Sequence, residues 1–527
     1  HFEGRLLGRI RLGLVRRRST PERPGVTRTS RQSKAAVMRT LTLFACCAVL
    51  FACPAEKKEA PVAPDAAEAA PAAPVELTLL FTGSENGYLL PSPGDDGQLR
   101  GGAAELLARW VEKEGHCAGP LDKNLEPACK DGSTVVLSTG DNASGAAISS
   151  VFHGEPTAEV MKHMGYAASA FGNHEVDFGR PQFARNRDVG GFPYLAANLP
   201  GSADSDSEAP LSLQGSVIIR RKGLEIAVVG LTSKKTRDDT MPGRLDDVTL
   251  VDDAQAMAAL PTIAKADAVV VLTDGCLSDF APVLEAHPEW KVTVAAGQQC
   301  SEAFPPNAGG AALVWPGRHF HGYGRAKLTF RGEKLTGVQA ETVEVGSGVP
   351  AEPKAQELIA AWKQKLDGML GEEIGFSAKG IEAGSPLMGT WLATALMDKY
   401  GADIGLVNAK GSRGALEKGP VKKEDIFQLI PFENSVVVVK VPGELLKQEL
   451  KNPEARFVGV KNAKAIDAKK TYTVATNSFV YFGGDGFGLK GADPQPNFTG
   501  EPWQDAVIEW TVKQSSSEAK PLEGFIK

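Results

Sequence analysis

The sequence predicts an α/β fold in which helices cover both faces of the sheets. Short apolar runs recur from residue 75 to about residue 345, and each runs into Gly, Ser, Thr, Asp or Asn. Continuous apolar runs are typical of strands that are buried on both faces. Polar residues directly after such strands are typical of functional loops. The predicted strands are Leu77–Thr82, Thr134–Ser138, Leu224–Thr232, Ala268–Thr273 and Val292–Ala296.

Helical patterns separate and follow these strands. Glu155–Met164 is predicted to be a helix that Gly165 ends. In Pro353–Leu370, apolar residues recur at helical spacing, which indicates an amphipathic helix connecting two domains. Its apolar face is predicted to hold Leu358, Trp362, Leu366 and either Met369 or Leu370. Beyond it we expect helices at Leu387–Lys399 and Pro442–Leu450 and strands at Ser435–Val441 and Thr471–Thr476.

Residues 1–37 are not expected to belong to the fold. They carry nine Arg and one Lys against two Glu, and they precede Met38. We predict a non-native upstream extension with Met38 as the natural start, and a basic nucleic-acid-binding arm is the alternative. Residues 38–52 combine a basic start with a short apolar run, which is typical of a signal peptide.

The residues that end the signal peptide resemble the lipobox of bacterial lipoproteins. In Leu50–Cys53, Cys53 occupies the position that is lipidated and becomes the first mature residue. Residues 53–75 are then an Ala/Pro-rich tether, because this composition cannot bury a core. We expect an exported protein, lipid-anchored in the bacterial cell envelope and facing either the periplasm or the surface. An exported protein can also form disulfides, and Cys117 and Cys129, which flank a short polar loop, are a predicted pair.

The net charge limits the class of partner. Loss of residues 1–52 removes a net charge of +9 and changes the total from −6 to −15. An acidic protein repels phosphate-rich polymers, so we expect no nucleic-acid polymer as partner.

Two strand ends carry motifs with strong chemical meaning. Gly-Asp follows one predicted strand, and Gly-Asn-His-Glu follows about 30 residues later. Together they resemble the calcineurin-like metallophosphoesterases. With Gly-Glu-Pro-Thr upstream of Gly-Asn-His-Glu-x-Asp-Phe-Gly, the chain is similar to the bacterial 5′-nucleotidase/UDP-sugar hydrolase family.

This resemblance implies a two-metal phosphoesterase site. In the family, two divalent cations bridged by one Asp activate a water and hold the phosphoryl oxygens. Asp141 corresponds to the bridging Asp and Asn173 to an Asn ligand. His174 corresponds to the His that stabilises charge or protonates the leaving group, and Asp177 corresponds to the Asp that orients it.

Five of the seven implied ligand places hold other residue types. Ser84 and Asn86 replace the family's opening Asp-x-His, and Asp274 replaces a His. Gln298 and Cys300 replace the ligands of the closing Gly-His-x-His or Gly-His-x-Gln. One ion position would hold Ser84, Asn86, Asp141 and Cys300, with a single carboxylate and weak neutral donors, and we expect it to be empty. His319 and His321 are expected on a later strand as surface or packing residues rather than as substitute ligands.

At the second ion position, all of the implied ligands are oxygen donors. Asp141, Asn173, Asp274 and Gln298 form a set that suits Mg²⁺, Mn²⁺ or Ca²⁺ rather than Zn²⁺. We therefore expect one divalent cation at most. In the alternative, no ion binds, and Asp274 and Gln298 supply only hydrogen bonds.

Cys276 and Cys300 stand in the two loops that normally supply opposing ligands. One expectation is a disulfide across the old metal site, and two buried thiols are the other.

The carboxyl-terminal part carries a second resemblance to the same family. Asn408–Arg413, Ile430–Asn434 and Asn477–Phe487 are similar to the family's nucleotide-binding motifs. In relatives, two Phe residues hold the base, an Asp accepts from the ribose hydroxyls, and Asn and Arg hold base and phosphate. The residues that correspond here are Asn408, Arg413, Phe432, Asn434, Phe479 and Asp485.

One departure and one alternative accompany this second resemblance. An Arg of the relatives is missing from Ile381–Pro386, where Glu382 would repel an anion. Alternatively, Phe432 and Phe479 are simply core residues.

The resemblance covers residues 76–527 and implies a domain order. We expect a metallophosphoesterase-like two-sheet sandwich at 76–346, a connector helix at 347–371 and a smaller α/β 5′-nucleotidase C-terminal domain at 372–527. Its implied partner is a nucleotide or nucleoside-like small molecule. Three functions stay open: hydrolysis of nucleotide-type phosphate esters with a reduced metal site, nucleotide binding without catalysis, and a structural role in the envelope.

Overall fold

The computed structural model describes residues 73–527, except residues 95, 130–131, 201–209, 262, 299 and 301. The expected upstream extension, the signal peptide, Cys53 and most of the tether lie outside the described residues. The described residues belong to one compact unit. Within these ranges, no helix has the length and apolarity needed to cross a membrane.

The first large sheet has the order β14-β13-β1-β4-β5-β6. Strands β1, β4, β5 and β6 run parallel, whereas β13 and β14 are antiparallel neighbours on the other side of β1. The carboxyl ends of the four parallel strands therefore lie at one edge. The bounds are β1 Val75–Thr82, β4 Thr134–Ser138, β5 Tyr166–Ala170, β6 Tyr194–Leu195, β13 Gly322–Arg331 and β14 Lys334–Glu344.

The second large sheet has the order β11-β12-β10-β9-β8-β7. Its inner strands β8, β9, β10 and β12 are parallel, and β7 and β11 are antiparallel at the edges. The bounds are β7 Ser216–Arg221, β8 Leu224–Leu231, β9 Ala268–Cys276, β10 Val294–Gln298, β11 Asn307–Ala308 and β12 Ala311–Val314.

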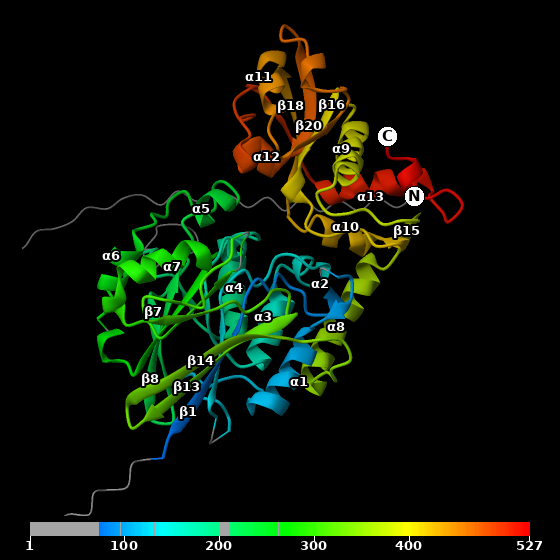
Figure 1. Ribbon diagram of the computed structural model, residues 1–527. Helices are drawn as coiled ribbons and strands as arrows, with labels where there is room; N and C mark the ends of the chain where they lie inside the picture. Colours follow the sequence, from blue (N-terminus) through cyan, green and yellow to red (C-terminus); the bar gives the residue numbers. More distant parts are fainter. Residues whose placement is uncertain are drawn as a thin grey trace, which may run out of the picture. The chain divides into compact units, whose positions relative to one another are not determined.

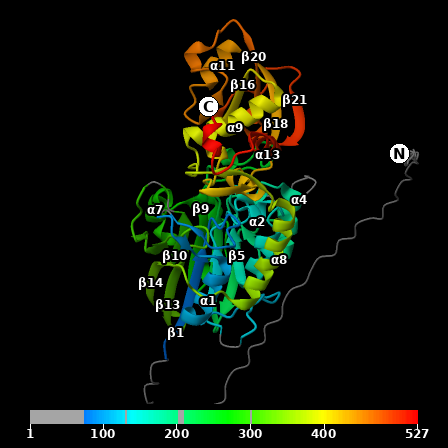
Figure 2. The same cartoon turned by 90° about the vertical axis from the view of Figure 1, so that its right-hand side faces the viewer.

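The two sheets face each other, and helices cover their outer faces (Figures 1 and 2). Leu79 of β1, Val228 of β8 and Val270 of β9 share the core between the sheets, whereas Leu80 packs under the helices of the first sheet. Both faces are buried, which explains the continuous apolar runs and confirms the predicted two-sheet α/β sandwich. The helices of this part are α1 Ala103–Glu114, α2 Ala147–Ser150, α3 Glu155–His163, α4 Arg180–Gly190, α5 Thr236–Asp239, α6 Asp253–Ala258 and α7 Leu277–Ala286.

The predicted helix α8 spans Pro353–Leu370. Pro353 is its first residue, and the Glu352 carboxylate caps it by accepting from the Ala355 N–H at 2.6 Å. Its buried face holds Ala355, Ile359 and Leu366 and packs into the helical core of the first sheet. The predicted face is confirmed: Leu366 is buried, and Leu358, Trp362 and Leu370 pack, partly buried, against the same core. Of the two alternatives at its end, Leu370 packs on the core and Met369 is 59% exposed.

The rest of the unit is built on a five-stranded sheet of order β19-β16-β20-β18-β21. One face packs on α9 and α13, and the other packs on α11 and α12. The strands are β15 Glu373–Ser377, β16 Ile404–Asn408, β17 Gly419–Lys422, β18 Ser435–Pro442, β19 Ala455–Val458, β20 Thr471–Asn477 and β21 Asn497–Pro502. The helices are α9 Pro386–Tyr400, α10 Lys423–Leu429, α11 Gly443–Glu449, α12 Ser478–Phe482 and α13 Trp503–Gln514.

The predicted strands and helices are confirmed to within a few residues at their ends. One placement was wrong: His319 and His321 lie in the turn before β13, not on a strand. His319 and Phe320 have φ angles of +54° and +56°, which a strand does not adopt. The domain boundaries at 346/347 and 371/372 stay a proposal.

Candidate functional site

Asp141 and the segment Asn173–Asp177 lie at neighbouring strand ends of the first sheet. Asp141 follows β4, and the short 3₁₀ turn η1 (His174–Val176) follows β5. The buried Glu175 carboxylate joins both loops by accepting from the backbone N–H groups of Asn142 and Gly172 at 2.8 and 2.7 Å. Burial and the charge of Asp141 raise the pKa of Glu175. Glu175 was not among the predicted site residues, although the Gly-Asn-His-Glu motif contains it.

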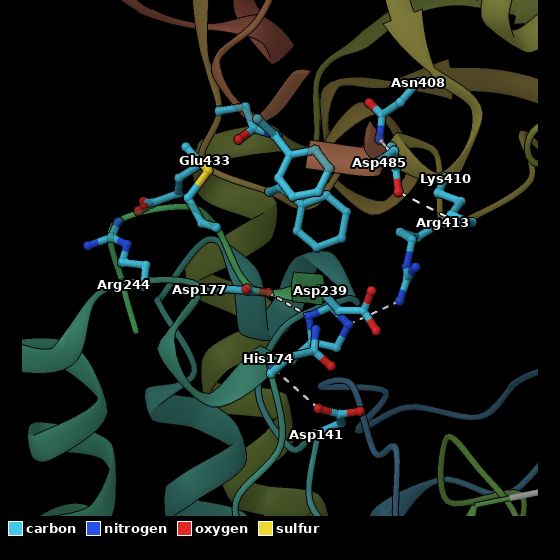
Figure 3. A pocket seen from close by; sticks show the side chains of 16 residues that line it. Asp141, His174, Asp177, Asp239, Arg244, Asn408, Lys410, Arg413, Glu433 and Asp485 are labelled. Atoms are coloured by element: carbon cyan, nitrogen blue, oxygen red, sulfur yellow. Dashed lines mark hydrogen bonds and ion pairs between the residues drawn. The ribbon is translucent and has the colours of Figure 1, made fainter. Parts of the chain in front are cut away.

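His174 lies between a carboxylate and a guanidinium (Figure 3). Its Nδ1 is 2.7 Å from Asp177 Oδ2, and its Nε2 is 3.0 Å from Arg413 Nη2. Arg413 can only donate, so in this contact Nε2 accepts and Nδ1 carries the proton toward Asp177. Burial lowers the pKa of His174, but the charges of Asp177 and Asp141 outweigh it, and the net shift is upward.

Asp274 and Gln298 were expected to ligate an ion at the second position, and their hydrogen bonds test whether they are available to do so. Asp274 accepts from the Ser233 N–H at 2.5 Å and from the Thr236 hydroxyl at 2.7 Å, one bond on each carboxylate oxygen. Gln298 Nε2 donates to Thr139 Oγ1 over 3.5 Å. Both side chains therefore already have partners in the protein.

At the first ion position, Asp141 is the one carboxylate among the implied ligands. Cys276 and Cys300 form a disulfide with a Cα–Cα distance of 5.6 Å, and disulfide sulfurs are not metal ligands of the thiolate kind. Asn86 donates its side-chain N–H to the Ser144 carbonyl at 3.0 Å. In the described part of the chain, no three His, Cys, Asp or Glu side chains gather as a metal group. The residues present do not fit a two-ion centre.

Most of the predicted site residues meet in one cavity of about 320 Å³ (Figure 3). All six predicted substrate-binding residues line it, together with Asp141, Asn173, His174 and Asp177. Asp274 and Gln298 do not line it. The cavity therefore joins the strand ends of the first sheet to the loops of the carboxyl-terminal sheet.

Phe432 and Phe479 present their rings to this cavity. Both are only partly buried, unlike the apolar residues of the neighbouring cores, which argues against a pure core role. A Cβ atom at Gly484 would lie 2.2 Å from the Phe479 ring, so only glycine allows this ring position. The Phe432 ring stacks at 5.8 Å on His174 and at 5.6 Å on the Arg413 guanidinium.

Asp485 is held at the rim of the cavity by Asn408. The Asn408 side-chain N–H donates to Asp485 Oδ2 at 2.7 Å, and Asn408 Oδ1 accepts from Asn477 at 3.1 Å. Asp485 itself has a φ of +52° in the turn η6 (Gly484–Gly486). Asn408 thus positions the carboxylate, and Asp485 keeps its other oxygen for a ligand or for Lys410, 3.8 Å away.

A loop that the sequence interpretation missed forms another wall. Asp239, Met241 and Arg244 line the cavity, and their loop follows β8. Asp274 anchors the start of this loop through Ser233 and Thr236. The sequence signalled this loop only through the predicted strand that precedes it, because the side chains of the loop match none of the family motifs described above.

The other predicted cysteine pair is also joined in the structure. Cys117 and Cys129 form a disulfide with a Cα–Cα distance of 6.1 Å. It closes the polar loop after α1, away from the residues that line the cavity.

Comparison with known proteins finds similarity to 5′-nucleotidases in the sequence and in the fold. Residues 365–459 match the family model of the 5′-nucleotidase C-terminal domain. Protein UshA of Yersinia enterocolitica is 22% identical over 531 residues, covering 85% of this chain and 92% of its own. A 5′-nucleotidase of Vibrio parahaemolyticus is 23% identical over 486 residues, covering 76% of this chain and 85% of its own.

A solved structure shares the fold over the same extent. The crystal structure of a 5′-nucleotidase precursor from Thermus thermophilus matches with a TM-score of 0.69 at 20% identity, covering 85% of this chain and 98% of that one. The sequence matches, the domain match and the shared fold agree with the motifs described above. Residues 365–459 belong to the 5′-nucleotidase C-terminal domain family, and the chain is similar to 5′-nucleotidases over most of its length.

Proposed function

We propose that this protein binds a nucleotide-type ligand and has little or no metal-assisted turnover. The observation that carries the proposal is the contrast between the two halves of the site. The six clamp residues meet in one cavity, whereas both oxygens of Asp274 are committed to hydrogen bonds within the protein. The degenerate metal site is part of the same proposal.

The clamp supplies the chemistry for a base and a ribose. Aromatic faces hold a base at about 1–3 kcal/mol each, which suits Phe432 and Phe479. The Asp485 carboxylate can accept from the ribose hydroxyls, and the Arg413 guanidinium can hold an anionic group. Without bound cations, a water near His174 lacks the activation that the family's reaction uses, and His174 with Asp177 cannot replace it.

Thermal unfolding in excess EDTA tests the binding. Adenosine and AMP should each raise Tm, because a ligand that binds only the folded state at 100 times its Kd adds about 2.7 kcal/mol of stability. Phosphate release from AMP should stay near background when Mg²⁺ or Mn²⁺ is added. A Tm that does not respond to either compound in EDTA contradicts the proposal.

A hydrolase with one hard cation is the second candidate. The carboxylates of Asp141 and Asp274 interact, and burial together with the charge of Asp141 raises the pKa of Asp274. Two such carboxylates can attract a cation. This candidate requires AMP turnover that rises with Mn²⁺ and falls in an Asp274→Asn variant. Asp274→Asn without a change in turnover excludes it.

We also propose that the protein is a lipoprotein of the cell envelope. The lipobox-like Leu50–Cys53 supports this proposal. The full chain should take up radiolabelled palmitate in a bacterial host, and Cys53→Ser should abolish the label. Unchanged labelling of that variant contradicts the assignment of Cys53.

A further inference from the structure

Arg244 brings a guanidinium to the cavity that no other side chain holds. It lies on the loop after β8 and lines the cavity. Its backbone N–H donates to the Met241 carbonyl, and its own carbonyl accepts from Arg180 at 2.8 Å. Among the residues that the structure describes, none pairs with the guanidinium itself. A Cβ atom at Gly179 would lie 2.8 Å from Arg244 Nη1, so this glycine leaves room for the guanidinium. The N–H donors of Arg244 are therefore available to a ligand.

Glu433 brings a carboxylate to the same cavity. One of its oxygens, Oε1, lies 2.6 Å from His153 Nε2, and the His153 ring packs against Phe178 with 5.4 Å between ring centroids. The other oxygen, Oε2, has no hydrogen-bond partner from any described residue. His153 therefore holds the carboxylate in place, and one oxygen remains available as an acceptor.

These two side chains lie across the cavity from the groups that suit ribose and phosphate. Figure 3 shows Arg244 and Glu433 on one side, and Asp485 and Arg413 on the other. A purine is joined to its ribose through N9, so its six-membered ring points away from the ribose. With the ribose at Asp485 and the base between the clamp rings, the edge formed by C6, N1 and C2 faces Arg244 and Glu433.

The hydrogen-bonding groups of this wall match guanine and not adenine. Guanine presents two acceptors, O6 and N7, and the guanidinium fork of an arginine such as Arg244 donates to both. Guanine also presents donors at N1 and at its 2-amino group, which suit the carboxylate of Glu433. Adenine places its 6-amino donor before the arginine and its N1 acceptor before the carboxylate, so that like groups face each other.

We propose that Arg244 and Glu433 make the site selective for 6-oxopurine bases, with guanine preferred. The inference rests on the proposed function and deepens it, because it names the base that the clamp holds. Neither residue is one of the six clamp residues. The stacked rings hold any base, and the two polar side chains at its outer edge choose between bases, since a site with fixed donors and acceptors rejects a ligand that leaves them unpaired.

Isothermal titration of the purified protein in excess EDTA tests this selectivity with GMP, IMP and AMP, which differ only in the base. GMP should bind about 30-fold more tightly than AMP, through a bidentate arginine pair and the contacts of Glu433. IMP lacks the 2-amino group and should bind about threefold more weakly than GMP.

Two variants separate the contributions of the two residues. Arg244→Met removes the donors and should reduce the preference for GMP over AMP from about 30-fold to about threefold. Glu433→Gln should bring the affinities of GMP and IMP to within about twofold of each other, because an amide has only one acceptor oxygen. Arg220→Met is the matched control for the arginine, since Arg220 pairs with Glu225 on β7 and β8 and lies outside the cavity.

The other outcomes separate this inference from the proposed function. Equal affinities for the three nucleotides, or tighter binding of AMP than of GMP, overturn the selectivity and leave the proposed function standing. An unchanged preference for GMP in Arg244→Met also overturns it, because Arg244 would not be the selecting residue. If none of the three binds in EDTA, the proposed function is contradicted and the inference is overturned with it. A melting curve of each variant shows that it is folded before it is titrated.

Discussion

Two regions of the site differ in how much of the family pattern they keep. The strand-end corner is the set of implied ligand positions, Ser84, Asn86, Asp141, Asn173, Asp274, Gln298 and Cys300, and the base clamp is the set Asn408, Arg413, Phe432, Asn434, Phe479 and Asp485. At the corner, only Asp141 and Asn173 match the implied ligand set, and Cys276 with Cys300 has become a disulfide. In the clamp, the matching residues converge, and Asn408 holds Asp485 at 2.7 Å. The clamp residues line one cavity, whereas Asp274 and Gln298 of the corner hydrogen-bond within the protein.

The two regions are built from different parts of the fold. The corner is built from strand ends of the two large sheets, whereas the clamp is built from loops of the five-stranded sheet. Glu175 still ties the Asp141 loop to the His174 loop by accepting backbone N–H groups. These hydrogen bonds join the two loops within the protein itself.

Removal of both aromatic rings of the clamp should have the largest effect on ligand binding. We expect Phe432→Ala with Phe479→Ala to weaken adenosine by more than about 30-fold, because each stacked ring contributes about 1–3 kcal/mol. Isothermal titration measures the affinity. Phe498→Ala is the control, since Phe498 is 50% exposed on β21 and lies outside the cavity. Unchanged affinity in the double variant would mean that the rings do not hold the ligand.

Opening the disulfide at the corner should cost stability and not binding. Cys276 and Cys300 close a loop with a sequence separation of 24, so replacing both by Ser should lower the free energy of unfolding by about 3 kcal/mol. Urea unfolding measures this loss. Adenosine affinity should stay the same at a temperature where the variant is folded. If the double Ser variant instead loses adenosine binding, the corner and the clamp are coupled.

Both regions have to be compared at a pH where the fold is stable, and His116 sets part of that limit. Burial lowers the pKa of His116 to about 4, and its ring nitrogens lie 2.9 Å from Thr134 Oγ1 and from the Met164 carbonyl oxygen. Below about pH 6.5 the unfolded chain binds a proton that the folded chain does not. Stability should therefore fall by about 2–3 kcal/mol between pH 6.5 and pH 4 from this residue.

Urea unfolding at several pH values checks the effect of His116. His116→Gln should reduce the slope between pH 6.5 and pH 4. His287→Gln, at the surface beside Glu289, should leave the slope as it is. A slope that His116→Gln does not change would assign the acid sensitivity to other groups.

Restoring part of the ligand set should have the smallest effect. Ser84→Asp with Asn86→His should change AMP turnover by no more than about threefold, because the remaining ligands of that ion position are still missing. Phosphate release with Mn²⁺ present measures the turnover. A larger gain from this pair alone would show that the first ion position is more complete than we propose.

The elements of the fold were largely predictable, because they depend on local patterns. Pro353 and the capping Glu352 fix the start of α8, and the buried run Thr134–Ser138 is a strand over those same residues. Which residues of α8 are buried most deeply was harder to predict. Ile359 is more deeply buried than the predicted Leu358, because burial depends on how the helix is rotated against α1 and α3. The packing of neighbouring helices determines this rotation, and the sequence pattern of the helix alone does not reveal it.

The candidate site was predictable where motifs carry it. His174 lies within hydrogen-bond distance of Asp177, as the motif suggested. Asn408 and Asp485 line the same cavity, but the hydrogen bond between them was not predicted. Arg244 was not predicted, because its place in the cavity depends on the path of a loop that Asp274 anchors.

The central claim is that the ligand site works without a metal. It is tested most directly by titrating adenosine into the dialysed protein in excess EDTA, with the metal content of the same sample measured by mass spectrometry. We predict saturation at one adenosine per chain, no bound divalent metal, and the same affinity after Mn²⁺ replaces EDTA. Binding that requires Mn²⁺, or a stoichiometric metal that survives EDTA, would contradict the claim.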